Sequence, residues 1–326
     1  MKKVLNVKLS AVALALMLGG VAPVSAGDNA AFLNDSKTDF NLRYRLETVD
    51  QDGVDEDATA STLKARVTWQ SGAFNNVKFN AELDHVMTLG ADDYNDASGT
   101  STKTGYPVVA DPTGTDLNQL NLTYQKDGLT LVAGRQRIVL GNQRFVGGVA
   151  WRQNEQTYDG YRVQYKADKG VTLDYSQIFN INRIFGPIGA RADLHGSFQL
   201  FNLSYKFSKE TKLVAYAYRL DFDTAAALSS RTLGFDLSHN FGKVTLSASY
   251  ATQTDYRDNP NDFSAAYHAI SAKTKLGKVN VVAGLERLGS DNGVGFTTPL
   301  ATLHKFQGFA DKFLGTPGTG IKDTYI

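Results

Sequence analysis

Apolar and polar residues alternate with a period of two along most of the chain from residue 37 onward. In the segment FNLRYRLE, for example, Phe40, Leu42, Tyr44 and Leu46 alternate with Asn41, Arg43, Arg45 and Glu47. Such alternation is typical of a β-strand with one apolar and one polar face. The pattern recurs near 63–69, 77–84, 120–125, 129–137, 160–166, 171–178, 197–207, 211–222, 230–239, 243–253, 265–275 and 278–288. The chain is therefore predicted to be all-β, with thirteen complete strands.

The connections between these segments alternate between short and long. Short turns such as ADKG, SKET and NFGK follow every second segment, whereas longer polar stretches, among them 88–115 and 180–195, follow the others. This alternation is characteristic of an antiparallel up-and-down transmembrane β-barrel, with short periplasmic turns and longer extracellular loops. No other part of the chain supplies a second sheet or a helix to cover the apolar faces, so lipid is expected to cover them.

Aromatic residues gather where the strands run into the short turns. They are Trp69, Tyr124, Tyr165, Tyr205, Phe207 and Phe241. Amphipathic rings favour the interface between membrane and water, so these residues are expected to form the periplasmic aromatic girdle of the barrel.

The last strand of the pattern is short. It begins near Ile321 and the sequence ends at Ile326, whereas a membrane-spanning strand needs roughly 9–11 residues. Thirteen strands with an open edge cannot satisfy their backbone groups in lipid. We therefore expect residues 27–326 to be an outer-membrane β-barrel that is incomplete at its C-terminus, with about two to four strands missing.

The N-terminal residues differ from the rest of the chain. Three lysines border an apolar run over 11–18, and the stretch ends in the small residues VSA at 24–26. This is the pattern of a bacterial secretory signal peptide, predicted here to be residues 1–26. Without it the chain has 31 Lys and Arg against 33 Asp and Glu, a net charge of −2, which argues against nucleic-acid binding. Cysteine is absent, which excludes disulfides, thiolate catalysis and cysteine-ligated metal.

Arg135 and Arg137 break the alternation. They fall in phase with the apolar residues of 129–133, which would place them in lipid. An unpaired arginine at the bilayer midplane costs about 2–4 kcal/mol. We expect a β-bulge near Gly134 to return both side chains to the lumen, or both to lie above the membrane.

The segment 213–222 allows either face to be the apolar one. Its outward residues are predicted to be Val214, Tyr216, Tyr218 and Leu220. This choice leaves Arg219 and Asp221 facing the lumen, as the polar interior of a barrel requires.

One block of the chain resembles a known family. It reads GRQRIVLGNQRFVGGVAWRQNEQTYDG and contains Gly134-Arg135-Gln136, Gly141-Asn142-Gln143-Arg144-Phe145, Trp151-Arg152 and Asp159-Gly160. Together with the first strand, FNLRYRLETVDQ, this block is similar to the alginate-export family of outer-membrane porins, and the similarity runs through most of the chain. The resemblance implies a barrel of about eighteen strands, with an arginine-lined pore for an anionic polysaccharide.

Basic residues concentrate on the predicted lumen face in the first half of the chain. The candidate pore-lining, anion-binding residues are Arg43, Arg45, Lys64, Arg66, Arg135, Arg137, Arg144, Arg152 and Arg162. Rings of arginine select anions, because a low-dielectric wall focuses their field and the guanidinium fork pairs with carboxylate. In the alternative, these side chains pair with Glu47, Glu82, Asp84, Asp159 and Asp174 in a structural ladder. Both can hold at once.

The sequence offers little for catalysis or metal binding. The histidines, His85, His195, His239, His268 and His304, are scattered, and none lies at metal-site spacing or beside a Gly-x-Ser-x-Gly turn. Asp84 and His85 are adjacent, but neighbouring residues of a strand point to opposite faces. The acidic loops 50–57 and 92–96 lack the ligand spacing of a defined calcium site. We expect no enzyme activity, no cofactor and no metal site.

The long segment 289–320 is predicted to contain a short helix. Thr298 would be its N-cap and Pro299 its first residue, with Leu300, Leu303 and Phe306 on one face. The segment would either plug or cap the pore, or form an ordered surface loop.

Two function classes follow from this pattern. The first is an outer-membrane porin that passes anionic small solutes or oligo- and polysaccharides; the second is a structural or plugged barrel, with an outer-membrane hydrolase a weaker third. The signal peptide and the barrel pattern place the protein in the outer membrane of a Gram-negative bacterium. The partners expected there are outer-membrane lipid and lipopolysaccharide, the barrel-assembly machinery and an anionic solute or oligosaccharide, and no nucleic acid.

Overall fold

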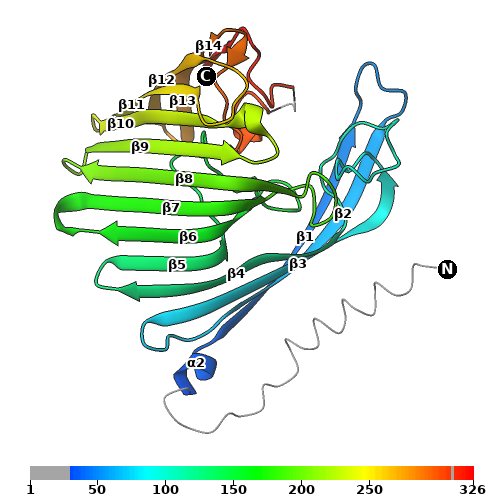
Figure 1. Cartoon of the computed structure of the whole chain (residues 1–326), viewed down its shortest axis with the longest axis horizontal. Coiled ribbons are helices and arrows are strands. Elements are labelled where there is room, and N and C mark those ends of the chain that lie inside the picture. The colour runs from blue at the N-terminus through cyan, green and yellow to red at the C-terminus, as the bar shows by residue number, and fades with distance from the viewer. Residues whose placement is uncertain (1–29, 310–311) are drawn as a thin grey trace.

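The structure, a computed structural model, describes residues 30–309 and 312–326. The predicted signal peptide, residues 1–26, lies outside the described residues. In the described part of the chain, fourteen strands form one antiparallel sheet in which each strand pairs with the next along the chain. Figure 1 shows them side by side in one curved sheet, from blue β1 to the red C-terminal end. The predicted all-β, up-and-down architecture is confirmed.

All thirteen predicted strands are present, although those at 58–70, 77–93 and 114–126 extend five to nine residues beyond the predicted segments at their long-loop ends. The main sheet contains β1 (Lys37–Val49), β2 (Ala58–Gln70), β3 (Val77–Asp93), β4 (Gly114–Lys126), β5 (Leu129–Gln136), β6 (Thr157–Lys166), β7 (Val171–Asn182), β8 (Asp193–Lys206), β9 (Thr211–Phe222), β10 (Ser230–Asn240), β11 (Val244–Asp255), β12 (Ser264–Leu276), β13 (Val279–Leu288) and β16 (Ile321–Tyr325). A separate pair joins β14 (Ser290–Asp291) to β15 (Val294–Gly295). The helical elements are α2 (Ala30–Asn34) and the short 3-10 turns η1 (Asp168–Gly170), η2 (Ala226–Leu228) and η3 (Leu303–Lys305). No helix of the described residues is long and apolar enough to cross a membrane.

The two ends of the strand order are β1 and β16. The short β16 pairs with β13 over five positions, from Leu288 opposite Ile321 to Gly284 opposite Tyr325. Among the described residues, neither the free edge of β1 nor that of β16 has a strand partner. The described strands therefore form an open, curved sheet.

One face of this sheet is apolar and exposed. Its side chains include Phe40, Leu42, Tyr44 and Leu46 on β1, Leu120 and Leu122 on β4, and Leu233, Phe235 and Leu237 on β10. Near the short turns, Tyr165, Tyr205, Phe207 and Phe241 are between 37% and 65% exposed. An apolar band that ends in an aromatic girdle is the outer surface expected of a membrane-spanning sheet.

The opposite, concave face is covered by the segment 137–156, which we call the interior loop. Its Phe145 packs against Tyr216 and Tyr218 of β9, with ring centroids 5.2 and 6.0 Å away. Phe145 also contacts Tyr267 of β12 and Phe296, at 5.4 and 5.9 Å. Phe145 packs in this way against one buried apolar cluster, which includes residues of β7, β8, β9, β11, β12 and β13. The main core of the molecule thus lies inside the curve of the sheet.

The predicted orientation of β9 is wrong. Tyr216, Tyr218 and Leu220 are only 4–6% exposed and pack in the interior, whereas Arg219 is exposed on the outer face. Both faces of this strand are apolar, because Leu213, Ala215 and Ala217 lie on the outer face together with Arg219. The alternation alone could not reveal that the interior loop would cover the tyrosines.

The bulge predicted near Gly134 is also wrong. Pairing of β5 with both neighbours is continuous, and the register shifts lie in the β3–β4 and β6–β7 pairs instead. Gly134 has a φ of +113°, and a Cβ there would lie 2.3 Å from the carbonyl oxygen of Leu120. β5 ends at Gln136, so Arg135 lies at the long-loop end of the strand and Arg137 lies in the interior loop.

The helix predicted from Thr298 is wrong: the described residues that follow Thr298 form only the single 3-10 turn η3, and the β14–β15 pair lies before it. This segment packs onto the interior loop, because Leu300 forms a parallel bridge with Val146. The ring of His304 stacks on that of Trp151, with centroids 3.5 Å apart. The two loops therefore form one assembly over the concave face.

Candidate functional site

Opposite sides of the sheet hold the interior loop. On β1, Arg43 donates hydrogen bonds to the backbone carbonyl oxygens of Trp151 and Arg152, the latter at 3.0 Å. On β13, Glu286 lies 2.9 Å from Nε of Arg144. The interior loop therefore reaches from the first strand to the thirteenth, and narrows the space enclosed by the curved sheet.

A first charged cluster lies beside β1. Nε of Arg45 is 3.0 Å from Oδ2 of Asp111, and Nη1 of Arg152 is 3.1 Å from Oε2 of Glu47. The Asp111 carboxylate is fully buried and accepts a hydrogen bond from the backbone N–H of Gln153 at 2.7 Å. Burial raises the pKa of Asp111, and the positive charge of Arg152 acts against that rise. The cluster thus ties the loop before β4 to the interior loop.

A second cluster joins β2 and β3 to the interior loop. Arg66 donates two hydrogen bonds to Asp84, at 2.7 and 2.6 Å, and its Nη1 is 2.8 Å from Glu155. Arg137 pairs with both Glu155 and Glu82. Burial alone would raise the pKa of Glu155, but the hydrogen bond and charge of Arg137, together with Arg66, lower it to about 2. Lys64 lies farther off, 3.8 Å from the same Asp84.

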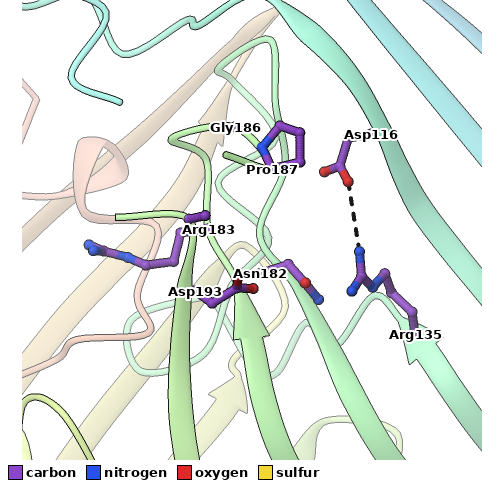
Figure 2. A pocket seen from close by; sticks show the side chains of 8 residues that line it. Asp116, Arg135, Asn182, Arg183, Gly186, Pro187 and Asp193 are labelled. Carbon is purple, nitrogen blue, oxygen red and sulfur yellow. Dashed lines mark ion pairs between the residues drawn. The ribbon is translucent and has the colours of Figure 1, made fainter. Parts of the chain in front are cut away.

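A third cluster borders a pocket at the long-loop end of the sheet. Arg135 donates to both carboxylate oxygens of Asp159, at 2.8 and 3.0 Å, and lies 3.7 Å from Asp116. Figure 2 shows Asp116 and Arg135 facing each other, with Asp193 nearby and the side chain of Arg183 directed away from them. This pocket is lined mainly by charged and polar groups.

Arg162 is held within the wall of the sheet. It donates two hydrogen bonds to Asp174, at 3.0 and 2.6 Å, and Gln164 donates a third to the same carboxylate at 2.8 Å. This pair connects β6 to β7 and involves no residue of the interior loop.

The nine predicted basic residues therefore form several separate groups. Eight of them lie within 4.0 Å of a carboxylate of the described residues, and Arg43 binds backbone carbonyls instead. The alternative prediction, a structural ladder of ion pairs, named five acids, and each of them takes part in one of these pairs: Glu47, Glu82, Asp84, Asp159 and Asp174. Sequence reasoning missed the partners Asp111, Asp116, Glu155 and Glu286, which lie in loops or on distant strands. Only Glu155, inside the arginine-rich block, offered a signal of its role.

Two further arginines lie in the loop between β7 and β8 and were not predicted. Arg183 and Arg191 lie over the ring of Phe185, at 4.5 and 3.8 Å from its centroid. Burial, and then the charge of Arg191, lowers the pKa of Arg183 to about 10. Neither guanidinium has a carboxylate within 4.0 Å among the described residues, so their positive charge is not balanced locally.

The remaining candidate chemistry is dispersed. Asp84 faces the interior, whereas Nδ1 of His85 lies 2.7 Å from the hydroxyl of Thr115 on the exposed side, so the two side chains do not meet. No group of three metal-ligating side chains gathers among the residues that the structure describes.

Comparison with known proteins gives one family and one fold. A family model described as alginate export matches residues 35–234. OpdO from Pseudomonas aeruginosa has a TM-score of 0.63 at 15% identity, covering 82% of this chain and 68% of its own. OccAB1 from Acinetobacter baumannii has a TM-score of 0.62 at 14% identity, covering 81% and 68%. OccD3 from P. aeruginosa has a TM-score of 0.59 at 10% identity, covering 82% of this chain.

These similarities differ in what they support. Identities this low show the fold alone, and the chain spans only 62% of the length of OccD3. No curated protein sequence matches the chain. The family match covers most of the described strands, from β1 into β10.

Proposed function

Because the chain belongs to the alginate export family, we propose that it forms an outer-membrane channel that passes acidic small solutes or oligosaccharides. The protein is located in the Gram-negative outer membrane, and its fold is that of outer-membrane porins. The long loops are then extracellular and the short turns periplasmic. Outer-membrane lipid surrounds the apolar face, while the barrel-assembly machinery and the transported solute remain proposed partners.

The observation that carries the proposed solute class is the unbalanced charge of Arg183 and Arg191. Both guanidinium groups lie at the extracellular end, stacked on Phe185 and without a carboxylate partner among the described residues. Arg183 also borders the pocket that contains Arg135. Positive charge at the mouth of a low-dielectric channel attracts anions and raises their local concentration.

The pairing of the arginines favours the release of a bound solute, which conduction requires after entry. Free arginines would hold a carboxylate tightly, because the guanidinium fork matches its geometry. Arg135, Arg66 and Arg162 each already have a bidentate carboxylate partner, so a passing acid must compete with that partner. Conduction requires binding that is favourable enough for entry and weak enough for release. We include the nine predicted basic residues in this pathway on that basis.

The proposal is tested by reversal potentials in a salt gradient. The full chain is reconstituted in planar bilayers of a neutral phospholipid, and Arg183→Gln with Arg191→Gln is compared with the parent protein. We expect the parent to prefer anions at low ionic strength, where screening is weakest, and the double variant to lose most of that preference. Arg219→Gln is the matched control, since Arg219 is exposed on the lipid-facing side of β9. Equal reversal potentials for the parent and the double variant would refute the role of the mouth arginines.

Charge reversal at two of the paired arginines tests the rest of the pathway. Arg135→Glu with Arg162→Glu should move the reversal potential toward cations and weaken block by an acidic oligosaccharide. If it does neither, the pairs with Asp159 and Asp174 are purely structural.

A second function is favoured by the filling of the interior. Phe145 and its aromatic neighbours, with Leu300 against Val146, place two loops inside the curve of the sheet. A barrel plugged in this way would be structural, and it would show no ion conductance.

A further inference from the structure

Two arginines lie side by side on the outer face of the sheet. Arg219 of β9 is directly opposite Arg231 of β10 in the strand register. Both are exposed, while Leu220 and Thr232 next to them are buried on the concave side. The guanidinium groups therefore project away from the interior, on the same face of the sheet as the apolar band.

Their height in the membrane follows from the strand that carries them. Phe241, 65% exposed in the turn after β10, belongs to the periplasmic aromatic girdle. Arg231 lies ten residues before it, and about 3.3 Å per residue at a tilt of about 40° gives a vertical distance of about 25 Å. This is the height of the apolar band of an outer-membrane barrel. Arg231, and Arg219 opposite it, thus lie where the acyl chains of the outer leaflet end and its head groups begin.

The local charge is strongly positive. Like charges directly opposite in a β-ladder destabilise it, and neither Arg219 nor Arg231 forms an ion pair or hydrogen bond with another described side chain. The one acidic residue beside them, Asp221, is 3.8 Å from a third arginine, Arg257. A second cross-strand basic pair, Arg287 opposite Lys322, is exposed on the same side of the sheet. An anion between the arginines would relieve their repulsion.

We propose that Arg219 and Arg231 bind a phosphate group of lipopolysaccharide in the outer leaflet. The lipid A head group carries phosphates at the level calculated for these side chains. Long arginine side chains can lie along the apolar surface and place their guanidinium groups among the head groups. The neighbours of the pair in the register, Gln199 and Thr254, add polar groups for the sugar hydroxyls. This site does not depend on what the channel transports.

The test measures lipid binding to the purified full chain in detergent by native mass spectrometry, with diphosphoryl lipid A as the probe. We expect Arg219→Gln with Arg231→Gln to weaken lipid A binding by about thirtyfold, the effect of two charges lost at an anionic lipid surface. Replacing both arginines with lysine should preserve most of the lipid A binding. That result would show that the positive charge, and not the substitution itself, determines binding. Lys209→Gln is the matched control, because Lys209 lies in the periplasmic turn of the hairpin that contains Arg219.

Two further probes identify the chemistry recognised. Lipid A without its phosphates should bind the parent protein as weakly as diphosphoryl lipid A binds the double glutamine variant. Inorganic phosphate should not displace the lipid at matched concentration, because it lacks the acyl anchor. Unchanged binding by the glutamine variant, equal binding of phosphate-free lipid A, or displacement by inorganic phosphate would each overturn the proposal.

Discussion

Gly134, in β5, has a backbone conformation and a close neighbour that leave no room for a side chain. Its φ of +113° is unfavourable for a side chain, and a Cβ would meet the Leu120 carbonyl oxygen at 2.3 Å. We predict that Gly134→Ala lowers the free energy of unfolding by about 1–3 kcal/mol. Urea titration of the protein in lipid vesicles measures this change. Gly105→Ala is the control, since nothing lies within 4 Å of a Cβ there, and an equal loss in both variants would contradict the explanation.

Glu155 determines the charge balance of the second cluster. Arg66 and Arg137 both bind it, so Glu155→Gln would leave two guanidinium groups with less compensation. We predict that this variant shifts the reversal potential toward stronger anion preference at neutral pH. A shift toward cations, or none, would show that the cluster does not face the conducting path.

The low pKa of Glu155 determines how the difference in reversal potential between the parent and Glu155→Gln depends on pH. Because its pKa, about 2, is below the ordinary value of about 4.3, its ionised form is the one stabilised in the folded protein. Its contribution to stability is present above the ordinary pKa and is lost as the pH falls through 2. The difference between the parent and Glu155→Gln should therefore be constant from pH 7 to 4. A titration of the difference near pH 5 would contradict the pairing with Arg137.

At the scale of elements, the interior loop is the part whose position decides the width of the proposed channel. Its contact with β13 depends on Arg144, which is 3% exposed and lies 2.9 Å from Glu286. Breaking a buried ion pair from one side costs about 3–5 kcal/mol, because the remaining charge is left uncompensated. We predict that Arg144→Gln loosens the loop and raises the single-channel conductance with larger current noise. Arg162→Gln, which breaks a pair inside the wall, should change the conductance less, and equal effects would contradict a special role for the loop.

The strands could be predicted from the sequence because membrane and lumen impose opposite polarities on successive residues. That argument found every long strand, and it failed on β9, where the lumen face is apolar. There the packing of Phe145 on Tyr216 and Tyr218 depends on a loop from elsewhere in the chain, which no local pattern encodes. The positive φ at Gly134 was not predicted, because an out-of-phase residue in the pattern does not reveal the backbone conformation beside it.

The candidate site was predictable in its residue types and not in its connections. The arginines of β1, β2 and β5 follow from the alternation, whereas partners such as Asp111 and Glu286 come from loops and strands distant in sequence. Arg183 and Arg191 stood outside any repeated pattern. Their importance appears only when Phe185 and the missing carboxylates are seen together.

At the scale of the whole molecule, the alternation of long and short connections predicts which strand ends face the cell surface. The chain contains no cysteine, so one introduced thiol reports its own location. We predict that Asp52→Cys, in the exposed long loop before β2, reacts on intact cells with a membrane-impermeant maleimide. Lys209→Cys, in a short turn, should react only after the outer membrane is opened. The reverse pattern would invert the proposed orientation.

The central claim is that the curved sheet, with its charged clusters and interior loop, conducts ions across the outer membrane. Single-channel recording of the full chain in planar bilayers tests it most directly. We predict discrete conductance steps that an acidic oligosaccharide blocks at low ionic strength, with weaker block when Arg183 and Arg191 are both replaced by glutamine. Protein that is correctly folded and inserted, yet produces no steps in the parent or in Arg144→Gln, would contradict the claim and identify a plugged, structural barrel.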